Sequence, residues 1–540
     1  MNESQELMKL KSDNDLTIIK NELSTNESSK KLSNKTIKLI FLILWIIIII
    51  ITLIINYNKR KINQELYFNS SFNQESSFNF EEYINKEKED ERNKKTKNNH
   101  NCNQFDPINM FNFRIKNGPK IICQNEESKH ICYQNNDGYY NDVLWHKNGA
   151  LCIMKNIILD PSKAEKTSYI YKGPVDPEKQ GFPRLSNGFF NMKCDNPNKL
   201  ENVNKIYDTY FDSWNYDNKP KKGEKIEELA PSKTILFLSR NEDSPNLFHG
   251  NSEIINVISM MHLFNLNPEN IQVIFLESII IKQDPFYDIY KNVISRGGEP
   301  IYINDLKQKY HISSAIHVPI NWDSPCFFTS EYPHDRYSIP NCQYPTQTYK
   351  LYNDLVDKYF NLIDFTDSFI SYKEIFYYPE SIIKNHKLKT KFNKAVTILW
   401  RKVWPKGRKG QKRIIGNGPE LADKLASILP KNILIRLVDT ASLPMNEQIS
   451  ILRKTDYLIG IHGAALSLSI FMPNKSIFHE IIHCPPLKVL QIMGALSGHK
   501  IYSDYIKSQV RIIEDSEYVF FNVDDFAKSV LDHMKENNYL

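Results

Sequence analysis

The sequence lacks three features that would narrow its class at once. It has no pair of cysteines separated by two residues, so the spacing typical of a structural zinc site is missing and no metal is expected. Its net charge is only +6 over 540 residues, which gives no support for binding nucleic acid. No cysteine precedes Cys102, although eight lie from that position onward. This last absence makes the distribution of the cysteines informative.

A long apolar run lies in the cysteine-free part. Residues 39–55 are apolar except for the mildly polar Thr52, and a run of this length can span the hydrocarbon of a membrane as a helix. A cleaved signal peptide is the alternative, but the run starts well inside the chain and no small-residue cleavage site follows it. Basic residues flank both ends, so charge biases the orientation only slightly. We expect a transmembrane signal anchor at 37–56 with a cytosolic amino terminus.

The cysteines all lie on one side of this run. Such a distribution suits an oxidising lumen in which they form disulfides, with eight reduced and buried cysteines as the alternative. Two acceptor sequons on the same side make Asn69 and Asn474 candidate glycosylation sites. We expect a disulfide between Cys326 and Cys342 to close the proline- and aromatic-rich stretch 325–350. The cysteines are Cys102, Cys123, Cys132, Cys152, Cys194, Cys326, Cys342 and Cys484.

Composition divides the chain into five parts. Residues 1–36 are polar without apolar periodicity and predict a disordered cytosolic tail before the anchor at 37–56. Residues 57–100 have the same character and predict a lumenal stalk. A globular head follows, which we divide into an amino-terminal lobe at 101–385 and a carboxyl-terminal lobe at 386–540. This is the organisation of a type II membrane protein.

The head predicts an α/β fold. Residues 102–230 appear irregular, whereas two series of alternating strands and helices follow. Such alternation predicts parallel sheets with helices on both faces, and two series predict two Rossmann-like lobes facing a cleft. The expected strands are 234–239, 272–277, 315–320, 395–400, 433–438, 457–461 and 476–481. The expected helices are 252–264, 349–360, 418–429, 444–454, 464–471, 486–497 and 527–536.

The stretch 457–481 holds the clearest candidate for a binding site. An apolar strand ends at His462-Gly463, and a helix begins at Ala464 and stops at Pro473. The first N–H groups of a helix lack internal partners and the dipole there is positive, so this turn could hold an anion. Ligands of open α/β sheets bind beyond the carboxyl ends of the strands.

Three patches together resemble glycosyltransferase family 61, and most of all its plant core β-1,2-xylosyltransferases. Secretory-pathway protein O-linked N-acetylglucosaminyltransferases are more distant relatives. The resemblance spans about 130–510, and the order and spacing of the patches make it more specific than any one of them. The patches are Ser239-Arg240 followed by Asn246-Leu-Phe-His249 and Glu253, the stretch 439–456, and the stretch 459–481, which is similar to Gly-x-His-Gly-Ala-Gly-Leu with a later Glu-Ile.

The resemblance implies a GT-B fold, inversion at the anomeric carbon and no essential metal or other cofactor. No Asp-x-Asp motif lies in a plausible site. Two positions depart from the family pattern. Ala465 stands where the family has its second glycine, which narrows the approach of a phosphate to the turn. Glu253 stands where relatives often carry aspartate, and its side chain reaches one methylene further.

Inverting sugar transfer needs a base for the acceptor hydroxyl and positive charge for the leaving diphosphate. Glu253 is the candidate base, with His249 orienting the base or the acceptor; the alternative is a helix-capping acid beside an ordinary partly buried histidine. Arg240 and Asn246 are candidates for the acceptor side of the cleft. The candidate donor ligands are Arg401, His462, Gly463, the backbone of Ala464 and Ala465, and Glu480 for the ribose.

Two of these donor residues have structural alternatives. His462 could be a core histidine without a ligand, and Glu480 could be a surface acid. The basic run 402–413 predicts a solvated loop, with attraction of an anionic nucleotide-sugar as the second interpretation.

The resulting prediction is a Golgi type II membrane enzyme, with the ER membrane as the alternative. Its partners are a UDP-sugar and a glycoprotein acceptor, with xylose transfer from UDP-xylose to the core mannose of N-glycans as the specific expectation. The alternative enzyme is a UDP-N-acetylglucosamine-dependent protein O-linked transferase. An alternative of another class is a non-catalytic lumenal glycan-binding protein that kept the fold.

Overall fold

The computed structural model describes most of the globular part of the chain, within one compact unit, Ile84–Leu540. Among the described residues no helix is long and apolar enough to cross a membrane, and the predicted anchor at 37–56 lies outside them, as do the predicted tail and stalk. The described residues are 102–117, 119–125, 127–134, 150–165, 185–194, 197, 212–217, 226–240, 246–276, 284–319, 339–363, 375–387, 391–400, 413–482, 488–505, 508–513 and 516–540.

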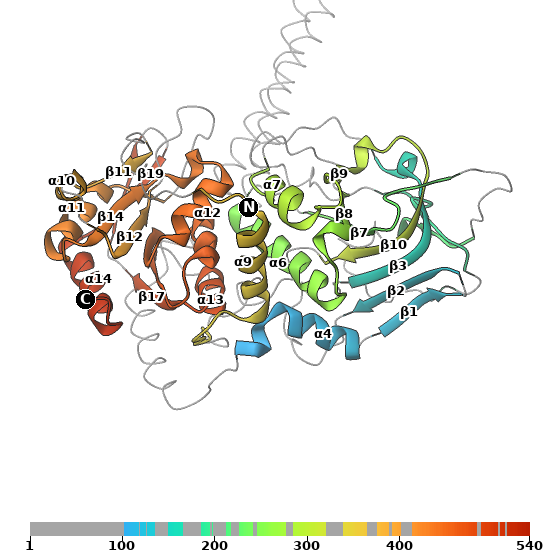
Figure 1. The fold of residues 1–540 in the computed structure, drawn as a ribbon, viewed down its shortest axis with the longest axis horizontal. Helices are drawn as coiled ribbons and strands as arrows, with labels where there is room; N and C mark the ends of the chain where they lie inside the picture. Colours follow the sequence, from blue (N-terminus) through green and yellow to red (C-terminus); the bar gives the residue numbers. More distant parts are fainter. Residues whose placement is uncertain are drawn as a thin grey trace, which may run out of the picture. The chain divides into compact units, whose positions relative to one another are not determined.

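The first sheet combines a parallel half with an antiparallel extension (Figure 1). The parallel half runs in the order β10, β7, β8, β9, and β10 also pairs antiparallel with β3, which continues to β2 and β1. The strands are β1 (Pro119–Gln124), β2 (Lys129–Gln134), β3 (Ala150–Leu159), β7 (Thr234–Leu238), β8 (Ile271–Phe275), β9 (Ile301–Tyr302) and β10 (Tyr310–Val318), with the short β4 (Phe190–Asn191), β5 (Trp214–Asn215) and β6 (Glu227–Glu228) beside them.

The prediction that residues 102–230 are irregular is therefore wrong. Strands β1 to β3 pair antiparallel with one another, unlike the parallel strands β7 to β10 that follow. The helices around this sheet are α4 (Pro107–Asn117), α6 (Leu247–Leu263), α7 (Tyr287–Ile289), the π-helical η5 (Tyr290–Ile294) and α9 (Gln347–Tyr359), with 3-10 turns at η1 (Cys102–Phe105), η2 (Pro161–Lys163), η4 (Pro268–Asn270) and η6 (Ile303–Asp305).

The second sheet has the order β11, β14, β12, β15, β16, β17, and all its strands are parallel except β11. The strands are β11 (Phe376–Tyr377), β12 (Lys394–Leu399), β14 (Ile433–Val438), β15 (Tyr457–Ile461), β16 (Ile477–Ile482) and β17 (Lys500–Tyr505). The helices are α10 (Glu380–Lys387), α11 (Gly418–Ile428), α12 (Met445–Arg453), α13 (Val489–Leu496) and α14 (Val523–Glu536), with 3-10 helices η8 (Thr440–Ser442) and η9 (Ala464–Phe471). A small third sheet holds β13 (Ile414–Ile415), β19 (Ser516–Phe520) and β18 (Gln509–Ile513).

The strands β14, β15 and β16 are buried along their whole length, which explains their largely apolar sequences. In β15, Leu458 packs on one face with η9, whereas Tyr457 and Ile459 pack on the other face with α14. The first of these faces joins a core that also contains Ile258 of α6 and Tyr352 of α9. The two sheets are therefore connected by one continuous apolar cluster.

The predicted boundary between the lobes, at residue 385, follows a short strand that pairs with the second sheet. Strand β11 lies within 101–385, yet it pairs with β14 of the second sheet through Phe376 and Tyr377. Only two residues of β11 are paired, so a run this short gives no periodic signal that would separate it from a loop.

Three disulfides join the described cysteines: Cys102–Cys342, Cys123–Cys194 and Cys132–Cys152. The expected pairing of Cys326 with Cys342 is wrong, and Cys326 and Cys484 lie outside the described residues. The buried Asp106 accepts a hydrogen bond from the Thr348 N–H at 3.1 Å. This contact holds the start of the head against α9, so that Cys102 reaches Cys342 instead.

We expect Cys102→Ser to lower the free energy of unfolding by about 2–5 kcal/mol, because the Cys102–Cys342 bond closes a loop with a sequence separation of 240. Cys132→Ser is the matched control, and it should cost less because its loop has a separation of only 20. Urea unfolding under non-reducing conditions measures both. A peptide map that joins Cys326 to Cys342 in the wild type would contradict the assignment.

Gly250 in α6 faces the ring of Phe286. A Cβ at this position would lie 2.2 Å from Phe286 Cε2, so Gly250→Ala should destabilise the protein by about 1–3 kcal/mol through overpacking, despite the better helix propensity of alanine. Replacing Phe286 by leucine in the same chain should recover part of that loss. Denaturation midpoints of the single and double variants test the contact, and additive effects would refute it.

Candidate functional site

The second sheet contains a topological switch point between β12 and β15. In chain order its parallel strands run 2-1-3-4-5, so the chain leaves β12 toward β14 and leaves β15 toward β16 in the opposite direction. The crevice at the carboxyl ends of two such strands is the usual ligand site of open α/β sheets. His462 and Gly463 follow β15 directly at this edge. Arg401, the other residue predicted there, lies outside the described residues.

His462 is held by a buried carboxylate. Its Nδ1 lies 2.6 Å from Oε1 of Glu480, which is fully buried in β16, while the Gln491 side chain donates to Oε2 of Glu480 at 2.8 Å. A carboxylate only accepts, so His462 donates from Nδ1 and its tautomer and ring orientation are set. The imidazole remains 9% exposed.

Glu480 thus faces His462 and Gln491 rather than solvent. The interpretation of Glu480 as a surface acid is therefore excluded. Both carboxylate oxygens of Glu480 already have protein partners, which differs from the free carboxylate expected of a ribose-binding acid. Sequence reasoning did not select Gln491. Nothing in the sequence brings α13 against β16 at this residue.

Ala465 fits its position without strain. It lies within η9, and it is not among the described residues with positive φ, so the freedom of a glycine is not needed for the backbone there. Ala464 and Ala465 are both partly exposed at the start of η9, next to Gly463. The departure from the family pattern at Ala465 therefore leaves the course of the turn intact.

Helix α6 begins before the residue at which the sequence predicted its start. Asn246 is its N-cap and accepts from the Phe248 N–H at 3.0 Å, so this residue has a structural role that the predicted cleft role did not include. His249 and Glu253 both lie inside the helix at positions i and i+4, and they share one face. Glu253 is 5% exposed and is not a capping acid.

The face of α6 that carries Glu253 meets the first sheet at its own switch point. Asn256, one turn beyond Glu253, donates to the carbonyl of Pro319 at 3.2 Å, just past the end of β10. Strands β7 and β10 diverge here, since β7 continues to β8 on its other side. Glu253 is thus oriented toward the edge where this sheet could bind a ligand.

Arg240 does not reach a cleft as predicted. It follows β7 and is buried, with its guanidinium ion-paired to Asp284 and 3.7 Å above the ring of Phe275. Through these two contacts, Arg240 connects the segment after β8 to the end of β7. Its role in this structure is to hold that edge of the sheet together.

The two candidate groups are connected through the elements that carry them. Asn251 of α6 donates to the Ser467 hydroxyl of η9 at 3.0 Å, and Tyr352 donates to Oδ1 of Asn251 at 3.3 Å. All three residues are buried. The helix of Glu253 is therefore packed against the 3-10 helix that follows His462.

Asn474, one of the two predicted glycosylation sites, lies in the exposed turn between η9 and β16. Asn69 lies outside the described residues. In the part of the chain that the structure describes, His130, Cys132 and Cys152 bring potential metal ligands within 4.8 Å of one another, but Cys132 and Cys152 are bonded as a disulfide. These residues do not form a ready metal centre.

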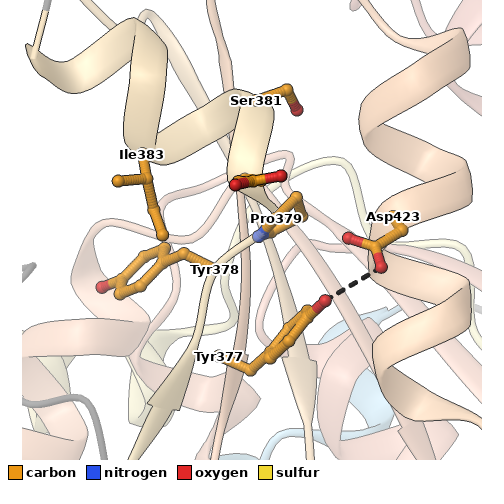
Figure 2. A pocket seen from close by; sticks show the side chains of 7 residues that line it. Tyr377, Tyr378, Pro379, Ser381, Ile383 and Asp423 are labelled. Atoms are coloured by element: carbon orange, nitrogen blue, oxygen red, sulfur yellow. Dashed lines mark hydrogen bonds between the residues drawn. The ribbon is translucent and has the colours of Figure 1, made fainter.

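A cavity of about 480 Å³ lies beside β11, away from the residues predicted as ligands. Figure 2 shows Tyr377 hydrogen-bonded to Asp423, with Tyr378 and Ile383 on the other side. Burial, and then the hydrogen bond to Asp423, raise the pKa of Tyr377 to about 12, so its phenol stays protonated and donates. Sequence reasoning gave no signal for this cavity, because its lining comes from three separate elements.

The buried His499 contacts the backbone of η9 and should make the free energy of unfolding depend on pH. Burial lowers the pKa of His499 to about 4, even though its Nε2 lies 2.8 Å from the Ser469 carbonyl. The unfolded histidine titrates near pH 6.5, so the stability is fully present above that pH and is lost as pH falls toward 4, by about 3 kcal/mol. His499→Gln should flatten the melting-temperature profile over this range, whereas His262→Gln at an exposed site should not. Equal profiles in all three proteins would refute the assignment.

Comparison with known proteins identifies a family that part of this chain resembles. The described structure is an α/β protein in which His462 lies at the switch point of the second sheet. Residues 327–478 match the family model of Glycosyltransferase 61, and this range contains β12, β15 and the turn at His462. The EGF domain-specific O-linked N-acetylglucosamine transferase of Drosophila melanogaster is 34% identical over 64 residues, which cover 12% of this chain and 12% of that relative's length.

The resemblance to glycosyltransferase family 61 seen in the sequence is thereby confirmed for residues 327–478, the range that matches the family model. Both comparisons support the glycosyltransferase class of enzyme. The patch from Ser239 to Glu253 lies outside the matched range, and its roles stay predictions.

Proposed function

We propose that the protein is an inverting glycosyltransferase with a nucleotide-sugar donor, and that the second sheet binds the donor. The observation that carries this proposal is the buried His462–Glu480–Gln491 chain of hydrogen bonds at the switch point. His462 lies inside the range matched by the family model. Two sheets that each contain parallel strands and share one core support the GT-B arrangement, in which donor and acceptor bind to opposite sides of a cleft. Glu480 then acts as a positioning residue behind His462.

In the proposed reaction, one proton is transferred, one bond forms and one bond breaks. Glu253 takes the proton of the acceptor hydroxyl as its oxygen forms a bond to the anomeric carbon of the donor. The bond from that carbon to the phosphate oxygen breaks, and the nucleoside diphosphate leaves with the electron pair. His462 and the first N–H groups of η9 stabilise the charge that develops on the leaving group. Attack opposite the leaving group inverts the anomeric carbon.

For the donor, UDP-N-acetylglucosamine with a protein hydroxyl as acceptor is favoured by the name of the matched Drosophila protein. UDP-xylose with the core mannose of N-glycans is the second candidate, and the resemblance of the three sequence patches to xylosyltransferases favours it. We propose the Golgi membrane as the location, with 37–56 as the anchor, and the ER membrane as the alternative. Three disulfides and an exposed Asn474 support a lumenal head.

Transfer assays on the full chain, purified from a secretory host, test this function. Each UDP-sugar is offered with an N-glycan and with folded EGF-domain acceptors, and the product is identified by mass. We expect transfer from one donor only. Binding of glycans without transfer or nucleotide binding would instead support the lumenal glycan-binding alternative.

A further inference from the structure

Arg413 is the last residue of the basic run 402–413, and the structure places it beside the His462 turn. Its Nη1 donates to the carbonyl oxygen of His462 at 3.2 Å, at the carboxyl end of β15. The side chain is partly exposed. Among the described residues, no carboxylate is ion-paired with Arg413. The guanidinium therefore places a positive charge at the switch point, and no described carboxylate neutralises it through an ion pair.

The backbone of Arg413 is strained. Its φ is 69°, in the left-handed region, where a residue with a Cβ costs about 1–2 kcal/mol relative to the usual conformations. Glycine would relieve this strain, so the fold alone favours glycine at this position. Strained residues of this kind cluster at functional sites, so the retention of an arginine here is consistent with a role for its side chain.

A guanidinium has five N–H donors in a planar fork, and the His462 carbonyl takes one of them. The others remain available to a ligand at the partly exposed edge. Planar, bidentate donation of this kind suits phosphate oxygens. The carbonyl of His462 also holds the guanidinium against the backbone of the turn that follows β15.

We propose that Arg413 is a diphosphate-binding residue, held at the switch point by the His462 carbonyl so that its remaining N–H groups meet the donor's phosphates. This inference rests on the proposed function. It assigns to one arginine of the basic run a direct contact, where the sequence suggested a solvated loop.

Arg413→Gly separates a binding role from a structural one, because it removes the guanidinium and the strain together. Calorimetric titration with UDP should show an affinity at least about tenfold lower, since a charge-assisted pair is lost. The melting temperature should stay the same or rise. Ala230→Gly is the matched control, since Ala230 also has a positive φ, 52°, but lies before β7 in the first sheet. This control should keep the wild-type affinity.

The outcomes are distinguishable. Arg413→Lys keeps the charge but loses the fork, so its affinity should fall between those of the wild type and Arg413→Gly. If wild-type protein does not bind UDP, the proposed function fails. If the wild type binds and Arg413→Gly binds equally well, the inference about Arg413 fails while the function stands. A lower melting temperature with unchanged affinity would make Arg413 structural.

Discussion

The Glu253→Gln variant should bind UDP like the wild type and lose sugar transfer by about 10²–10⁴-fold, because an amide cannot accept the acceptor proton. Glutamine has nearly the same shape, so α6 and its contact with Ser467 through Asn251 should remain. Initial rates at saturating donor and acceptor measure kcat, and titration with UDP measures affinity.

Glu253→Asp is the matched control for this prediction. It keeps the carboxylate one methylene shorter, and aspartate is common at this position in relatives, so transfer should be reduced far less than in Glu253→Gln. If both variants lose transfer to the same extent and melt at lower temperatures, Glu253 is a structural residue of α6 and the base must be sought elsewhere.

The second large effect should come from His462→Ala, which we expect to weaken UDP binding by about 10–100-fold. The variant removes a donor aimed at the diphosphate and leaves Glu480 as a buried carboxylate with one hydrogen bond fewer. Part of its effect will be a lower melting temperature. The affinity, measured well below that temperature, isolates the loss of binding.

His479→Gln is the control for His462→Ala. His479 is fully buried in the same strand as Glu480, but it lies on the other face of the sheet, where its Nδ1 lies 2.8 Å from the Tyr457 hydroxyl. The control should lower stability without changing UDP affinity. Equal loss of affinity in both variants would mean that His462 acts only by supporting the sheet.

Four strands of the second sheet, β12, β14, β15 and β16, were predicted from the sequence, whereas β11 and β17 were not. Strands β14 and β15 begin and end at the expected residues, as does the helix Ala464–Phe471, because buried apolar runs and proline breaks carry strong local signals. The first sheet was only half predicted. Its antiparallel strands β1 to β3 are neighbours in the sequence, but they join the sheet through the pairing of β3 with the distant β10, which no local pattern encodes.

The candidate site divides in the same way. The position of His462 directly after a strand could be predicted, because the apolar run of β15 ends at the residue before it. The side chains around His462 could not be predicted. Gln491 of α13 contacts Glu480, and Arg413, directly before β13, contacts the His462 carbonyl. Arg240 and Asn246 were singled out by a motif that is also consistent with an ion pair and a helix cap. Residue type alone could not separate these roles.

Photoaffinity labelling with a UDP analogue that carries an azide on uracil tests most directly whether the second sheet binds the donor. The account predicts that competition by unlabelled UDP removes label from peptides within 391–505, where the loops after β12, β15 and β16 lie. Competable label on peptides of the first sheet, or on the peptide that carries residues 377–383 beside the cavity, would contradict it.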